Sequence, residues 1–309
     1  MKVIRGIDAI DFRGKFPYPV LTIGNFDGVH IGHRAIFEMV ESRARENNGT
    51  SMAFTFEPHP LKVVAPSTPL RLLTTSEEKE RLIRACGIDV LILASFSKRF
   101  ADQHPEEFIK DILVDRIGVR EVFVGHDYSF GKGRKGTPEL LKKLGEGYGF
   151  KVTVLDAVKI DGQIVSSSKI RSLLLKGDVE KAARFLGRPY SIEGIVVEGR
   201  KIGASVLGIP TANITTPNEI VPKEGVYAVT VSFDKDRYMG VANIGKNPTF
   251  GQEKMSYEVH ILDFSGNLIG KRLRMNFIRR IRDEIRFDTP GQLSLQIKND
   301  IMTARDVLS

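Results

Sequence analysis

The sequence predicts an α/β domain built on a parallel sheet, followed by an antiparallel β-barrel. In the first 160 residues, apolar runs typical of buried strands alternate with amphipathic stretches typical of helices. This alternation favours a parallel sheet covered on both faces. After about residue 187, short strand-like runs are punctuated by Gly, Pro and Asn, with little helix between them, which favours a barrel or sandwich. The length of 309 residues also suits two domains, since one domain commonly holds roughly 100–200 residues.

The first half contains five predicted strands, at residues 19–24, 51–56, 90–96, 121–125 and 151–158. Helices are predicted between them, over 34–46, from 75 to Gly87, from 104 to near Gly118, and from Thr137. Several of these begin with a hydroxyl or His cap followed by acids, which is a helix-start signature. The residues expected on the buried sides of the first two helices are Ala35, Phe37 (or Ile36), Met39 and Val40, then Leu82, Ile83 and Ala85.

The second half contains five predicted strands, at residues 194–197, 225–233, 238–244, 257–264 and 273–281. In the last of these, Leu273, Met275 and Phe277 alternate with polar residues, the period of a half-buried strand. A closing helix is predicted over 292–307. The boundary is placed near Gly187, which gives domains of residues 1–186 and 187–309.

Composition excludes some classes of protein. No run approaches the roughly 20 apolar residues that cross a bilayer, and the first residues, which include Asp8, do not form a signal peptide. One cysteine, Cys86, forms no internal disulfide, which suits the cytoplasm. The net charge of +8 suits phosphorylated small substrates. We therefore expect a cytoplasmic protein that binds neither nucleic acid nor membrane, as a monomer or weak homo-oligomer.

The first candidate site is the histidine loop (residues 24–33), Gly-Asn-Phe-Asp-Gly-Val-His-Ile-Gly-His, between the first strand and the first helix. Ligands bind at the carboxyl ends of parallel strands, and a helix N-terminus presents free N–H groups to anions. His30 and His33 are three residues apart, so a helical turn directs both to one ligand. They could stabilise charge on a phosphoryl group during transfer. The alternative is a strand-to-helix turn with two capping histidines.

A second anion-binding element is the serine segment (residues 166–171), with hydroxyls at a helix start followed by a cation. Together the two segments resemble the nucleotidyltransferase superfamily, in which the first holds the α- and β-phosphates of ATP and the second the outer phosphates. The resemblance implies roles in catalysis for His30 and His33. It implies ATP contacts for Gly24, Asn25, Phe26, Asp27, Gly32, Ser166, Ser167, Ser168 and Arg171.

Two further loops follow the second and fourth predicted strands. The Pro58 loop (residues 55–60) and the Tyr128 loop (residues 124–136) lie at the same sheet edge as the histidine loop, and their aromatics could stack a flat ring. The alternative is two irregular loops with incidental aromatics. They resemble the FMN- and ATP-binding loops of prokaryotic FAD synthetases. The resemblance implies an ATP contact for Asp127, and flavin contacts for Phe56, Pro58, His59, Pro60, Tyr128 and Phe130.

The second half carries Pro210-Thr211-Ala212-Asn213 and, on a later strand, Glu258. Thr and Asn oxygens suit Mg²⁺, and a strand carboxylate can accept a proton from a substrate hydroxyl. Glu258 is out of phase with Tyr257, Val259 and Ile261, so it faces the other side, beside His260. The alternatives are a polar turn and a solvated strand acid.

The set is similar to riboflavin kinase. The resemblance implies metal contacts for Thr211 and Asn213, and a catalytic base at Glu258 for the ribityl hydroxyl. It implies flavin contacts for Asn243, Arg282 and Phe287, and ATP contacts for Gly199, Lys201, Gly203, Ser205 and Pro210. The phosphate loop departs from the family pattern, because Glu198 precedes Gly199, and Ala204 and Ser205 follow Gly203. An acid there is expected to weaken ATP binding.

The order of the two regions resembles the prokaryotic bifunctional riboflavin kinase/FMN adenylyltransferase family over almost the whole chain. The resemblance implies a Rossmann-like nucleotidyltransferase domain, then a six-stranded Greek-key barrel with a terminal helix. It also implies Mg²⁺, with ATP as co-substrate and riboflavin, FMN and FAD as substrates or products. The alternatives are an enzyme in which only the adenylyltransferase half is active, and a flavin-responsive regulator or nucleic-acid binder that kept the fold.

Overall fold

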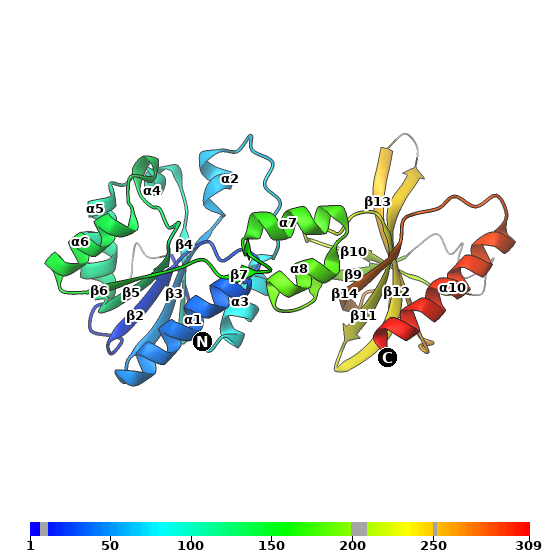
Figure 1. The fold of residues 1–309 in the computed structure, drawn as a ribbon, viewed down its shortest axis with the longest axis horizontal. Helices are drawn as coiled ribbons and strands as arrows, with labels where there is room; N and C mark the ends of the chain where they lie inside the picture. The colour runs from blue at the N-terminus through cyan, green and yellow to red at the C-terminus, as the bar shows by residue number, and fades with distance from the viewer. Residues whose placement is uncertain (7–11, 199–208, 250–251) are drawn as a thin grey trace. The chain divides into compact units, whose positions relative to one another are not determined.

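The computed structural model describes residues 1–6, 12–198, 209–249 and 252–309. The chain forms two compact units, Met1–Ser166 and Ser167–Ser309, which are coloured along the chain in Figure 1. Among the described residues, no helix is long and apolar enough to cross a membrane.

Unit 1 is built on a parallel sheet of six strands in the order β1-β4-β3-β2-β5-β6. The five strands predicted for this half are present, and the expected Rossmann-like sheet is confirmed. The edge strand β1, whose two apolar residues are flanked by charges, was not predicted. The strands are β1 Lys2–Arg5, β2 Pro19–Ile23, β3 Thr50–Glu57, β4 Val90–Ser95, β5 Glu121–Gly125 and β6 Lys151–Leu155.

Helices cover both faces of this sheet (Figure 1). One apolar core lies between the sheet and helices α1 and α3, and the other lies between the sheet, η1 and α6. The helical elements are α1 Ile31–Glu46, α2 Pro60–Val64, α3 Ser76–Ala85, α4 Lys98–Ala101, α5 Pro105–Glu107, the π-helix η1 Phe108–Ile117, the 3₁₀ turn η2 Lys132–Arg134 and α6 Pro138–Tyr148, with a small hairpin of β7 Lys159–Ile160 and β8 Gln163–Ile164.

The buried side of α1 differs in part from the prediction. Phe37 and Val40 are buried as expected, but Met39 is 43% exposed, and Ala44 is buried instead. The three buried residues follow a spacing of three and four, and Met39 falls between them, on the outer side of the helix. Ala85, predicted on the inner side of α3, is also exposed, because it falls at the end of the last turn.

Unit 2 opens with two helices, α7 Ser167–Lys176 and α8 Val179–Leu186, and continues as a closed antiparallel barrel. In the order β10-β13-β12-β11-β14-β9, three consecutive strands, β11 to β13, are followed by β14 beside β11, which is the Greek-key arrangement. The barrel strands are β9 Tyr190–Val197, β10 Ala212–Thr215, β11 Gly225–Phe233, β12 Asp236–Thr249, β13 Gln252–Ile261 and β14 Arg272–Arg282. The six-stranded barrel is therefore confirmed, although the short strand β10 was not predicted.

The predicted closing helix is present as α10, Pro290–Leu308, and it lies against the barrel (Figure 1). Its Ala304 packs with Val226, Ala228 and Val241 from β11 and β12.

Helices α7 and α8 belong to the barrel unit because they bond to it. The backbone N–H of Lys223 donates to the carbonyl of Leu174 in α7 at 3.0 Å, and Arg279 of β14 pairs with Glu180 of α8 at 2.9 Å. The boundary between the two compact units, after Ser166, thus differs from the proposed domain boundary at 186/187. That boundary stays a prediction.

Candidate active sites

The strand order of unit 1 gathers the three predicted loops. The chain passes from β2 outward to β3 and β4, then returns to place β5 on the other side of β2. This reversal is a topological switch point, where open parallel sheets leave a crevice beyond their carboxyl ends. The Tyr128, histidine and Pro58 loops follow β5, β2 and β3, which are neighbours in the sheet.

The two histidines lie against each other at the start of α1. His30 is the N-cap residue, and its Nδ1 accepts a hydrogen bond from the backbone N–H of His33 at 3.3 Å. The rings stack with centroids 3.5 Å apart, and the ring of Phe26 meets His33 edge-on at 5.3 Å. The two imidazoles therefore lie side by side, and the expectation that both face one ligand stays a prediction. They lie where the N-terminal end of α1 attracts anions.

The histidine loop holds an unusual backbone. Phe26 and Val29 have positive φ values of 49° and 40°, although neither is glycine. Such conformations persist only where the surroundings impose them, and they concentrate at functional sites. Gly24 is needed for space, because a Cβ there would lie 2.8 Å from the ring of Phe26.

A neighbouring segment holds this backbone in place. The carboxylate of Asp27, which is only 4% exposed, accepts hydrogen bonds from the backbone N–H groups of Leu73 and Thr74 at 2.9 and 3.3 Å. The backbone N–H of Gly28 donates to the hydroxyl of Thr74 at 3.2 Å. Asp27 therefore supports the loop from inside, and its predicted contact with ATP stays a prediction.

The Pro58 and Tyr128 loops present aromatic rings. Phe56 contacts Phe96 and Phe100 edge-on, with ring centroids 5.4 and 5.8 Å away. Tyr128 stacks on Phe130 at 5.3 Å, and burial raises the pKa of the Tyr128 hydroxyl.

Glycine and histidine shape the ends of these two loops. A Cβ on Gly136 would lie 2.7 Å from the ring of Phe130, so the two segments pair only with glycine there. His59 is buried and caps α2, because its Nδ1 accepts from the N–H of Leu61 at 3.2 Å. A flavin contact by His59 stays a prediction, as do those of Pro58 and Pro60.

The serine segment begins at Ser166, the last residue of unit 1, and continues into α7, which begins at Ser167 in unit 2. Arg171 donates from Nη1 to the hydroxyl of Ser168 at 3.4 Å, so the cation and a hydroxyl share one face of the first turn. Ile170 and Leu174 are buried on another face.

In the barrel, three polar residues meet across adjacent strands. Asn213 of β10 and Asn243 of β12 both lie directly opposite Glu258 of β13. Directly opposed residues of an antiparallel pair share a face, so the three form one row. Val259 and Ile261 are 1% and 5% exposed, so Glu258 points away from the barrel interior as predicted. Its Oε1 accepts from the hydroxyl of Ser256 at 3.0 Å.

A second carboxylate approaches this row. Glu284 accepts a hydrogen bond from Asn243 and lies over Gly245, where a Cβ would collide with it. Partial burial and the charge of Glu258 raise the pKa of Glu284, against the bond from Asn243, which lowers it. Glu284 was not among the predicted site residues, because it follows the end of β14 and its partner Asn243 lies far away in the sequence, on β12.

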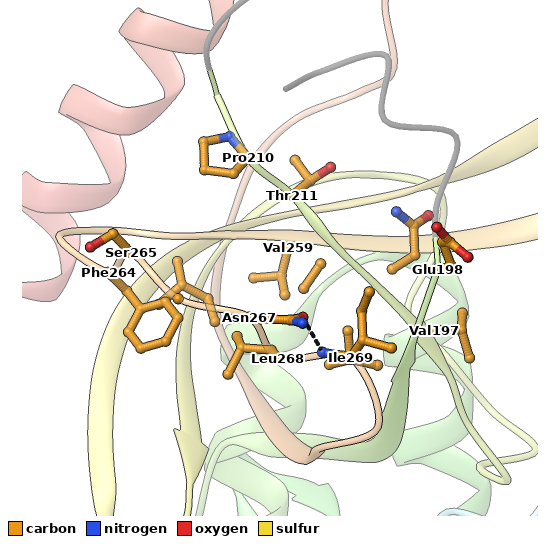
Figure 2. Close-up of a pocket in the computed structure, with 15 residues that line it drawn as sticks. Val197, Glu198, Pro210, Thr211, Val259, Phe264, Ser265, Asn267, Leu268 and Ile269 are labelled. Carbon is orange, nitrogen blue, oxygen red and sulfur yellow. Dashed lines mark hydrogen bonds between the residues drawn. The ribbon is translucent and has the colours of Figure 1, made fainter. Parts of the chain in front are cut away.

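One member of the row, Asn213, reaches a pocket of about 350 Å³. In Figure 2 the polar groups of Thr211 and Glu198 lie in the upper part of the view, and the apolar Leu268 and Ile269 in the lower part. Asn267 also lines it and accepts from the backbone N–H of Ile269 at 3.0 Å. The remaining lining residues are Val196, Val197, Pro210, Ala212, Val259, Ile261, Phe264, Ser265 and Gly266. A largely apolar pocket with a few polar groups is typical of a small-ligand site.

The comparisons with known proteins cover both halves of the chain. A family model for FAD synthetase matches residues 16–169, and one for riboflavin kinase matches residues 186–308. A protein of Escherichia coli K12 named bifunctional riboflavin kinase/FMN adenylyltransferase is 38% identical over 99% of this chain and 97% of its own length. The protein of that name from Pseudomonas fluorescens is 39% identical over the same shares. The chain belongs to the bifunctional riboflavin kinase/FMN adenylyltransferase family.

One solved structure shares the whole fold. A crystal structure from Streptococcus pneumoniae, described as a macrolide-efflux protein, covers 99% of both chains with a TM-score of 0.89 and 30% identity. This likeness extends through the parallel sheet and the barrel alike.

The other predicted kinase residues include four in the phosphate loop and two near α10. Gly199, Lys201, Gly203 and Ser205 lie outside the described residues. Arg282 makes a two-point ion pair with the buried Asp300 of α10, at 2.7 and 2.9 Å, and lies 5.9 Å from the ring centroid of Phe287. This guanidinium joins β14 to α10, and a flavin contact by Arg282 or Phe287 stays a prediction.

Proposed function

We propose that the chain converts riboflavin to FMN in its barrel and FMN to FAD at the edge of its parallel sheet, using ATP in both steps. The observation that carries the proposal is the pairing of two sites in one family member. One is a stacked histidine pair at a helix N-terminus beside a switch point, and the other is a carboxylate flanked by two asparagines beside a pocket. The substrates are those in the names of the relatives.

In the adenylyl transfer, the phosphate of FMN attacks the α-phosphorus of ATP and pyrophosphate leaves. The FMN phosphate is already ionised near neutral pH, so the step needs positioning and charge stabilisation more than a base. His30 and His33 would donate hydrogen bonds to the phosphoryl oxygens, supported by the positive end of the α1 dipole. Phe56, Tyr128 and Phe130 would hold the flavin ring by stacking. The remaining ATP contacts of the histidine loop, Asp127 and the serine segment are part of this proposal.

In the kinase step, Glu258 would accept the proton of the ribityl 5′-hydroxyl while the oxygen attacks the γ-phosphorus of ATP and ADP leaves. The pocket beside it would take the nucleotide. Thr211 and Asn213 fit Mg²⁺, because they offer hard oxygen atoms at the pocket and leave positions for phosphate and water. Bound there, Mg²⁺ would neutralise charge on the phosphates. Asn243 would hold the flavin beside Glu258.

A second candidate function is adenylyl transfer alone. The observation that favours it is Glu198, whose carboxylate lines the kinase pocket, where it would repel ATP phosphates. Supplying riboflavin with MgATP and separating the flavins by chromatography decides between the two. FMN formation supports the two-step enzyme, and FAD formed only from added FMN supports the single-step one.

The division of labour is tested with one variant in each half. His33→Ala should abolish FAD formation and leave FMN formation unchanged. Glu258→Ala should abolish FMN formation and leave the conversion of added FMN to FAD unchanged. Equal loss of both products in a folded His33→Ala variant would contradict the assignment.

A further inference from the structure

We propose that Lys79 is a positioning residue for adenylyl transfer: its buried ammonium group ties the histidine loop to the Pro58 loop. The inference rests on the proposed function of unit 1. It concerns a residue of α3 for which the sequence motifs imply no role.

The contacts of Lys79 reach both loops. The residue is 8% exposed, and its Nζ lies 3.4 Å from the carbonyl oxygen of Phe56 and 3.5 Å from the hydroxyl of Thr55. That hydroxyl in turn donates to the carbonyl of Asn25 in the histidine loop at 3.2 Å. One ammonium group therefore connects the end of β3 with the loop that follows β2.

The chain just before Lys79 supports the histidine loop from the same side. Leu73 and Thr74 hold Asp27 and Gly28 through the hydrogen bonds described above. Thr75 then caps α3 by accepting from the N–H of Glu78 at 3.2 Å. Residues 73–79 thus form a bracing segment, and Lys79 is its one cation.

Stability alone does not account for a lysine here. Burial of an ammonium group is costly unless it is paired, and the two acceptors of Lys79 are neutral oxygens at long hydrogen-bond distances. Burial lowers the pKa of Lys79, while the carboxylates of Asp27, Glu57 and Glu80 act to raise it. A methionine of similar length would fill the space without this cost. A buried charge that costs stability at this position is typical of a functional site, where stability is commonly lower than the fold would allow.

The charge also suits its place. A cation in a dry region under two loops that receive phosphates and a flavin acts more strongly than one in water. It holds the loops at the separation that the two substrates require, and a misplacement of about 1 Å costs on the order of 100-fold in rate.

The test compares Lys79→Met and Lys79→Arg with Ile83→Val, a change to a fully buried core residue of the same helix. For each protein, kcat and KM of FAD formation from FMN and of FMN formation from riboflavin are measured, with the midpoint of thermal unfolding. We expect Lys79→Met to lower kcat/KM for FAD formation by about 10- to 100-fold. Its unfolding midpoint should stay the same or rise, and FMN formation should not change. Lys79→Arg, which keeps the charge, should recover part of the loss.

The control separates positioning from stability. Ile83→Val is expected to lower the unfolding midpoint by a few degrees, roughly 2–4 °C per kcal/mol, with little effect on FAD formation. A purely structural role for Lys79 predicts the reverse pattern. Lys79→Met would then have a lower unfolding midpoint, and its activity would fall only in proportion to the folded fraction. That result would overturn the inference. Unchanged FAD formation in a folded Lys79→Met variant would overturn it as well. Failure of the unaltered protein to form FAD would instead refute the proposed function.

The pH profile gives an independent readout. The groups that face Lys79 are Asp27 from the histidine loop, Glu57 from the end of β3 and Glu80 from its own helix. Because burial lowers the pKa of the amine, its charge is lost at lower pH than that of an exposed lysine. The rate of FAD formation by the unaltered protein should therefore fall as the pH rises into the alkaline range. In Lys79→Arg the same fall should begin at a higher pH. Identical alkaline limbs in the two proteins would contradict the role of the charge.

Discussion

Replacing Asp300 with alanine tests how strongly α10 is fixed to the barrel. The Asp300 side chain is 2% exposed and accepts from Nε and Nη2 of Arg282 and from Nε2 of Gln296, each at 2.9 Å or less. Removing one partner of a buried ion pair costs about 3–5 kcal/mol, since the other charge is left uncompensated. The Arg282 side chain is 16% exposed and keeps a bond to the carbonyl of Asp283 at 3.0 Å, so we expect the lower end, about 3 kcal/mol.

The matched control is Asp263→Ala, which removes another two-point pair of an arginine with an aspartate. Asp263 binds Arg305 of α10 at 2.6 and 2.8 Å, but the two side chains are 66% and 42% exposed. An exposed pair contributes little, because water and salt screen it. Calorimetry should show the barrel transition lowered by roughly 10 °C in Asp300→Ala, and no measurable change in Asp263→Ala. Equal shifts in the two variants would refute the reasoning from burial.

Two further predictions concern the barrel row and the sheet. Gly245→Ala should displace the carboxylate of Glu284 from Asn243. Steady-state assays should then show a higher KM for riboflavin, and the midpoint of thermal unfolding should not change. An unchanged KM would contradict this role for Glu284. The carboxylate of Glu121, which is 4% exposed, accepts hydrogen bonds from Tyr18 at 2.7 Å and from Arg43 at 2.9 Å. Desolvation alone would raise the pKa of Glu121, but these hydrogen bonds lower it below the ordinary 4.5. The folded state therefore binds this proton less readily than the unfolded state, and the stabilisation is complete above pH 4.5 and lost as the pH falls through the lowered value. In denaturation experiments across that pH range, the stability of Glu121→Gln should fall less steeply with decreasing pH than that of the unaltered protein. An equally steep fall in both proteins would contradict the contribution of Glu121 to stability.

The strands of the parallel sheet could be predicted because continuous apolar runs stand out against polar helices. The same reasoning failed for β1 and β10, which have four residues each. Four residues give too few alternations to establish a period. The burial of Met39 was predicted wrongly, because a helix of mixed composition has no single clear apolar side.

The site residues divide in a similar way. The histidine pair could be predicted, because a spacing of three residues along a helix start determines how the rings meet. The row of Asn213, Glu258 and Asn243 depends on strand register, and the bracing contacts of Lys79 and Asp27 join segments more than 20 residues apart. No local pattern encodes such contacts, so they emerge only from the fold.

The central claim is that one chain performs two consecutive reactions, with FMN as the product of the first and the substrate of the second. The most direct measurement is a time course of riboflavin, FMN and FAD in a single reaction of the unaltered protein with riboflavin and MgATP. The account predicts that FMN rises first, and that FAD follows after a lag as FMN is consumed, with ADP and pyrophosphate both released. A reaction in which riboflavin stays unchanged, or FMN accumulates without conversion to FAD, would contradict it.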